Sequence, residues 1–160
     1  MKPRLTGFTL IEMLITVTLI GIAASVALPF GAMVETRARE AELRAALRTI
    51  RQALDSYKAA ADAGAIDKPT GTSGYPPNLE VLVKGVPRSA ALGFNSAPFV
   101  LLRKLPRDPF FADKSVDAAQ TWNIRSYGAA PNDFAQGADV FDVSSKSDRR
   151  ALDGTLLGDW

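Results

Sequence analysis

The sequence predicts an α+β fold in which one long N-terminal helix, apolar in its first half, packs on a small antiparallel β-sheet domain. Residues 8–34 are apolar apart from a single charge at Glu12. Residues 122–129 and 138–143 alternate and are rich in aromatic and β-branched residues, which is typical of strands. Between these regions, apolar residues recur at steps of three and four along one helical face, at Leu43, Leu47, Ile50, Leu54 and Tyr57.

The first part of the predicted helix is long enough to cross a membrane. From Met13 to Val34 there are about 22 uncharged residues, and at a rise of ~1.5 Å each they would reach ~33 Å. A helix of this length would span the ~30 Å hydrocarbon core of a membrane. Lys2 and Arg4 precede this segment and predict a cytoplasmic N-terminus. The length argues against a cleaved secretory signal, although residues 23–25 imitate a cleavage site.

Two residues stand out within the apolar segment. A carboxylate in a membrane helix costs up to ~2.5–3.5 kcal/mol at the centre, so Glu12 either lies near the interface or pairs with a positive group of a neighbouring subunit. Cleavage between Gly7 and Phe8 would create such a group, an α-amine one helical turn away. Pro29 lacks a backbone N–H, which predicts a kink or an easily melted turn.

The segment Gly7 to Glu12, G-F-T-L-I-E, resembles the prepilin motif of type IV pilins and type II secretion pseudopilins. It follows a short basic leader and precedes an apolar helix with a proline at a matching offset. The resemblance implies cleavage by prepilin peptidase after Gly7 and N-methylation of Phe8. It also implies that Glu12 pairs with the Phe8 amine of an adjacent subunit, and that Pro29 is a site of helix melting.

The remaining residues extend the helix and add a small domain. No strong breaker occurs between Gly31 and Gly64, which predicts one helix from about Phe8 to about Ala61. Residues 64–77 are rich in Gly, Pro, Ser and Thr and read as a loop. Residues 78–83 are expected to form a short helix capped by Asn78.

In the second half of the chain, the resemblance points to one subfamily of these proteins. Three segments are similar to conserved parts of the type II secretion major pseudopilin: Tyr75-Pro76-Pro77, Leu105 to Phe110 (LPRDPF) and the ending Gly158-Asp159-Trp160. This likeness implies a pseudopilus subunit in the bacterial inner membrane whose C-terminal domain lies in the periplasm. It implies as partners further copies in a helical filament, prepilin peptidase, the inner-membrane assembly platform, minor pseudopilins and lipid.

The same family holds calcium in its C-terminal loop, and the resemblance suggests Ser145, Asp148 and Asp153 as ligands. Leu156 stands where an aspartate usually occurs in that family. Calcium takes about six to eight oxygen ligands, so main-chain carbonyls or water would have to complete the shell. An ordinary solvated loop is the alternative.

Composition limits the other functions. The chain has no Cys and no His, which excludes disulfides, thiolate metal sites and catalysis by either residue. Its net charge of +2 indicates no nucleic-acid partner. We therefore expect no enzyme, and three parts: a leader (1–7), a transmembrane and filament-core helix (8–34) and a periplasmic domain (35–160). A type IV pilin or competence-type pseudopilin is the alternative within this class, and a membrane-anchored periplasmic binding domain or enzyme is the alternative from another class.

Overall fold

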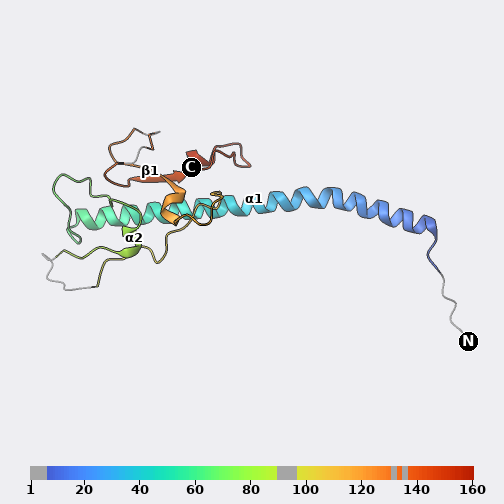
Figure 1. Ribbon diagram of the computed structural model, residues 1–160, viewed down its shortest axis with the longest axis horizontal. Coiled ribbons are helices and arrows are strands. Elements are labelled where there is room, and N and C mark those ends of the chain that lie inside the picture. Colours follow the sequence, from blue (N-terminus) through green and yellow to red (C-terminus); the bar gives the residue numbers. More distant parts are fainter. Residues whose placement is uncertain (1–6, 90–96, 131–132, 135–136) are drawn as a thin grey trace, which may run out of the picture. The chain divides into compact units, whose positions relative to one another are not determined.

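A computed structural model describes residues 7–89, 97–130, 133–134 and 137–160, with the side chains of residues 26–29 left out. Its main element is the helix α1, Leu10–Asp62, which confirms the predicted long helix to within about two residues at each end (Figure 1). The chain divides into two compact units, Met1–Ala38 and Arg39–Trp160, and α1 runs through both.

The end of α1 has a local cause in the sequence. Gly64 has a φ of 69°, the left-handed conformation that glycine adopts without a steric penalty. The N–H of Ala65 donates to the carbonyl of Ala60 (2.9 Å), and the N–H of Gly64 donates to that of Ala61 (3.1 Å). These two bonds form a Schellman motif, which satisfies the last carbonyls and stops the helix.

The core of the second unit lies along the predicted apolar face of α1. Leu43 and Ile50 are fully buried, and the other residues of that face are buried beside them. Trp122 and Val143 bring the strands against the helix, and both are buried. Burying such a side chain contributes about 1.5–3 kcal/mol, so this face is what holds the unit together.

The sheet is small and antiparallel. Strand β1 (Trp122–Arg125) pairs with β2 (Asp142–Ser145), so that Trp122 lies opposite Ser145 and Arg125 opposite Asp142. Together with α1 this is the predicted α+β arrangement, and it is consistent with a pilin-like fold.

Both strands differ from their predicted bounds. The first ends at Arg125 rather than at residue 129, and the second begins at Asp142 rather than at residue 138. Within the described residues, the chain before β2 makes only one main-chain bond to β1, from the N–H of Phe141 to the carbonyl of Arg125 (2.8 Å). The N–H of Val140 donates instead to the carbonyl of Pro76 (2.8 Å), and the Asp139 carboxylate accepts the N–H of Tyr127 (2.9 Å). An alternating pattern marks extended chain, but it does not say which partner the chain bonds.

Shorter elements complete the unit. The helix α2 is Val81–Lys84, which begins later than predicted, and Glu80 directly before it makes no side-chain cap. The N–H of Val81 donates to the Asn78 side-chain oxygen (3.1 Å), so Asn78 caps the turn that leads into the helix. Two 3₁₀ turns follow, η2 (Ala118–Thr121) and η3 (Leu157–Asp159).

Candidate processing and assembly site

The predicted cleavage point lies outside regular structure. Gly7 and Phe8 precede the first turn of α1, and Phe8 is 74% exposed. Among the described residues, a Cβ placed on Gly7 would meet no atom within 4 Å. The packing of the described residues therefore gives no reason for a glycine at this position.

Thr9 and Glu12 form a helix start that sequence reasoning missed. The Thr9 hydroxyl oxygen accepts the N–H of Glu12 (3.3 Å), and Thr9-Leu10-Ile11-Glu12 matches the T-x-x-E capping-box pattern that would have revealed it. Glu12 also lies in the first helical turn, where the helix dipole favours an acid. The carboxylate is exposed, and among the described residues it has no ion-pair partner. It is thus free to meet a positive group outside the chain.

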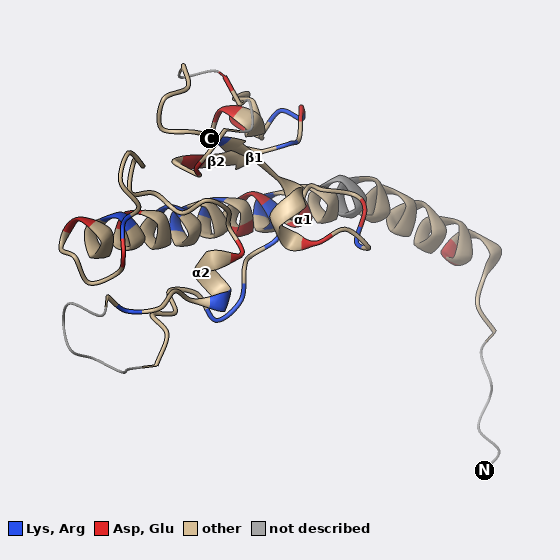
Figure 2. Ribbon diagram, turned by 60° about the vertical axis from the view of Figure 1, so that its left-hand side comes forward, with Lys and Arg blue, Asp and Glu red and all other residues tan. Residues whose placement is uncertain are grey.

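The first half of α1 exposes its apolar side chains on every face. Ile11 is 64% exposed and Leu14 63%, and the same holds along the segment. By length and composition this stretch of α1 could cross a membrane, with a mean hydropathy of 2.2 and none of its span buried. In Figure 2 the described residues of the first half are tan apart from one acidic position near its start, whereas charged residues are frequent along the second half. Large exposed apolar surfaces mark membrane or protein contacts.

Pro29 lies within α1, which is assigned as helix without interruption from Leu10 to Asp62. Its side chain is outside the described residues. The predicted kink or melting at this position stays a prediction.

Residues 4–28 match the family model of the prokaryotic N-terminal methylation motif. The match covers the leader residue Arg4, the cleavage point, Glu12 and most of the apolar segment. The chain matches no curated protein and no solved structure. The motif and the fold together support a pilin-like structural subunit that is processed by prepilin peptidase, anchored by its apolar helix and assembled into filaments.

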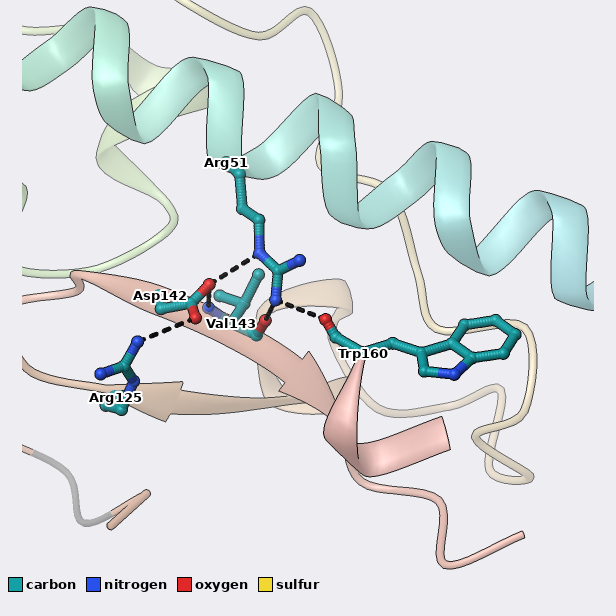
Figure 3. A network of polar contacts seen from close by, with 5 residues as sticks. All are labelled: Arg51, Arg125, Asp142, Val143 and Trp160. Atoms are coloured by element: carbon teal, nitrogen blue, oxygen red, sulfur yellow. Dashed lines mark hydrogen bonds and ion pairs between the residues drawn. The ribbon is translucent and has the colours of Figure 1, made fainter. Parts of the chain in front are cut away.

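A second polar site ties the end of the chain to α1. The Arg51 guanidinium donates to the Asp142 carboxylate (2.7 Å), to the carbonyl of Val143 (3.0 Å) and to the main-chain oxygen of Trp160 (2.6 Å), as Figure 3 shows. Arg125 donates to the other oxygen of Asp142 (3.1 Å). One arginine of the helix therefore holds β2 and the last residue at once, and we call these contacts the Arg51 clamp.

Two further contacts hold the last loop on the same helix. The Arg44 guanidinium carbon lies 3.9 Å from the ring centroid of Trp160, and Arg44 also pairs with Asp153 (3.4 Å). The buried Glu40 carboxylate accepts the N–H of Leu152 (2.7 Å). The loop is thus bonded to the helix by side chains of both charges.

The predicted calcium ligands are engaged in other contacts. The Ser145 hydroxyl donates to the Asp108 carboxylate (2.5 Å). One Asp153 oxygen accepts both the N–H (3.0 Å) and the hydroxyl (2.6 Å) of Thr155, and the other faces Arg44. Asp148 is exposed, and within the described parts of the chain no three His, Cys, Asp or Glu residues converge. Calcium binding by these three residues stays a prediction.

Asp108 explains the LPRDPF motif, which the sequence suggested only by resemblance. Its carboxylate is buried and accepts the hydroxyl of Ser145 and the N–H of Phe110 (2.8 Å), while its own N–H donates to Thr121 (3.2 Å). Neighbouring Trp122 donates its indole N–H to the carbonyl of Pro106 (3.0 Å). The motif fixes its loop to β1 and β2.

Proposed function

We propose that the chain is a structural subunit of the type II secretion pseudopilus, which assembles from the inner membrane and drives protein export across the outer membrane. The single observation that carries a filament role is the first half of α1, which is apolar on all faces and carries one unpartnered carboxylate among the described residues. Such a surface needs lipid or other apolar helices around it, because each large side chain contributes about 1.5–3 kcal/mol when buried.

Processing would prepare the chain for assembly. Prepilin peptidase would cut after Gly7, and the new N-terminal Phe8 would be methylated. Both residues are exposed and precede the helix, which supports access by a peptidase. The leader would lie in the cytoplasm and the unit Arg39–Trp160 in the periplasm.

Assembly would exchange one apolar environment for another. Subunits would wait in the inner membrane, and the assembly platform, with minor pseudopilins, would move them into a filament in which neighbouring helices replace lipid. Because α1 satisfies its own backbone hydrogen bonds, this transfer exposes no unpaired polar backbone. Glu12 would pair with the Phe8 amine of the adjacent copy and so set the register between subunits.

The choice of a secretion pseudopilus among pilin-like proteins is supported by the resemblance in the second unit. The segments at 75–77, 105–110 and 158–160 have structural roles in this chain. Pro76 accepts a bond from Val140, Asp108 ties its loop to β2, and Trp160 is held by Arg44 and Arg51. These contacts give the resemblance a physical basis.

Mass spectrometry of the mature chain and a secretion assay would test the proposal together. We expect a mature N-terminus at Phe8 that carries one extra methyl group, and loss of protein export when the gene is deleted. A mature chain that still begins at Met1 would contradict processing. Correct processing with intact export, but with loss of surface pili or of DNA uptake, would indicate a type IV pilin or a competence-type pseudopilin instead.

A further inference from the structure

A groove in the second unit has the form of a docking site. It has a volume of about 920 Å³. One wall is the start of this unit's part of α1, from Arg39 to Thr49, and the other is the loop from Lys104 to Lys114. Charged and apolar side chains line the groove. The apolar ones include Ala45, Ala46, Leu105, Pro106, Phe110 and Phe111.

The loop wall is held in place by its own contacts. The Arg107 guanidinium donates to the carbonyls of Val116 and Asp113, the second at 2.8 Å. Asp108 ties the middle of the loop to β2, as described above. The groove is therefore formed before any ligand arrives, which reduces the entropy that binding would cost.

The groove is basic. Lys104, Lys114 and Arg149 line it, are exposed and have no ion-pair partner within the described parts of the chain. Glu42 is its exposed acid, because the other acidic lining residue, Asp108, is buried and hydrogen-bonded. These cations favour a ligand that brings negative charge, and the apolar lining favours an accompanying apolar side chain.

The whole unit, in contrast, is almost neutral. Three of the 19 basic residues, Lys2, Arg4 and Arg37, and two of the 17 acidic ones, Glu12 and Glu35, precede Arg39. The unit Arg39–Trp160 therefore has 16 basic and 15 acidic residues. A basic groove on a near-neutral unit leaves a surplus of acids on its other surfaces, so one copy is complementary in charge to the next.

We propose that the groove, lined by Lys104, Lys114 and Arg149, receives an acidic segment of a second copy of this chain. This inference rests on the proposed function, because copies bundled by their apolar helices lie side by side. The helix wall begins at Arg39, only five residues after the apolar segment ends at Val34, so neighbouring copies must lie close to it. A bilayer surface carries negative charge too, but it is flat, whereas these three cations line a concavity.

Charge reversal tests the inference in the full chain, produced with its processing and assembly machinery. The variant combines Lys104→Glu with Lys114→Glu, and the control combines Lys84→Glu with Lys146→Glu. Both control lysines are exposed and outside the groove, and the change in net charge is the same. We expect at least a tenfold loss of filaments for the groove variant only. The tryptophan melting curve should be unchanged for the groove variant and only slightly lowered for the control, because there Lys84 loses its exposed pair with Glu80 (2.6 Å) and Lys146 its bond to the carbonyl of Gln120 (2.7 Å).

A zero-length carbodiimide reagent, which joins lysine amines to contacting carboxylates, identifies the occupant. In filaments mixed from ¹⁴N- and ¹⁵N-labelled chains, we expect mixed-isotope cross-links from Lys104 or Lys114 to an acidic residue. Wild-type filaments without such links, or a groove variant that assembles normally, would overturn the inference and leave the proposed function standing. A groove variant that assembles normally but loses binding to anionic vesicles would assign the groove to lipid. A correctly produced wild-type chain that forms no filament would overturn both proposals.

Discussion

The two halves of α1 have the same backbone but opposite surroundings. In the first half, Ile15 is 52% exposed and Ile20 67%. In the second half, Leu43 and Ile50 are completely buried under the strands and loops of the second unit. Both halves are rich in apolar residues, but only the second is amphipathic.

The difference separates folding from assembly. The second half stabilises this chain by burying one face against its own residues, while some charged residues of this half, such as Arg48, remain in solvent. The first half has no polar face, so it gains its stabilisation only from lipid or from other copies. Substitutions in the two halves should therefore affect different measurements.

The largest effect should come from the single carboxylate of the first half. Glu12→Gln keeps a residue that suits the capping box but removes the charge that would pair with the neighbouring amine. The lost attraction is about 4 kcal/mol for charges 4 Å apart at an effective dielectric constant near 20. We expect filaments to be lost while membrane insertion and the tryptophan melting curve stay unchanged.

A matched control separates pairing from capping. Thr9→Ala removes the bond from the Glu12 N–H at a cost of about 1 kcal/mol, and we expect it to leave filaments in place. Normal filaments from the Glu12→Gln chain would show that the charge is not needed, and the pairing would have to be abandoned.

The next largest effect should be on the stability of the second unit. Leu54→Ala in the buried face removes packing and leaves a cavity, which costs about 2–5 kcal/mol. Ile15→Ala in the first half should leave this stability unchanged. Trp122 and Trp160 both lie in the second unit, so tryptophan fluorescence of the full chain in detergent during thermal unfolding reports that unit alone. Equal shifts for the two variants would contradict the division of roles.

A smaller effect should follow from breaking the Arg51 clamp. Arg51→Ala removes three hydrogen bonds, two of them to main-chain oxygens, and should lower the free energy of unfolding by about 1–3 kcal/mol because the contacts are only half-buried. Arg48→Ala removes a neighbouring exposed arginine that has no ion-pair partner among the described residues, and should change little.

Thermal unfolding followed by tryptophan fluorescence also tests whether calcium stabilises the second unit. Because Ser145 and Asp153 are engaged with protein groups, we expect the melting temperature to stay the same with added calcium and with a chelator. A rise in calcium that the chelator reverses would restore the metal to this loop, with ligands other than those placed here.

The smallest effect should appear at low pH. Hydrogen bonds from the hydroxyl and the N–H of Thr155 hold the pKa of Asp153 below its ordinary value of 3.8. A lowered pKa stabilises the folded state above the ordinary value, and this contribution is lost as the pH falls through the folded-state pKa. Between about pH 4 and pH 2, the melting temperature of the wild type should fall slightly more than that of Asp153→Asn. Parallel curves would show that these bonds do not stabilise the fold.

Much of this protein follows from local patterns. The apolar run and the recurring face predict α1 almost to its ends, and Gly64 and Asn78 mark a stop and a cap, because helix formation and capping depend on residues within one or two turns. The processing motif is equally local and is read from residues 4–28. The T-x-x-E cap at Thr9 is equally local, because it depends only on residues 9–12.

Contacts between distant residues needed the tertiary structure. Strand β2 begins at Asp142 rather than at residue 138, and Val140 before it bonds the carbonyl of Pro76. The suggested ligand Ser145 bonds Asp108, which lies 37 residues away in the sequence. The Arg51 clamp joins residues about a hundred positions apart. The sequence by itself determined the helix, its apolar first half and amphipathic second half, and the processing signal, because their causes lie within a few residues. Only the tertiary structure decided which polar groups are free and which are engaged, because a hydrogen bond depends on where the fold places its partner.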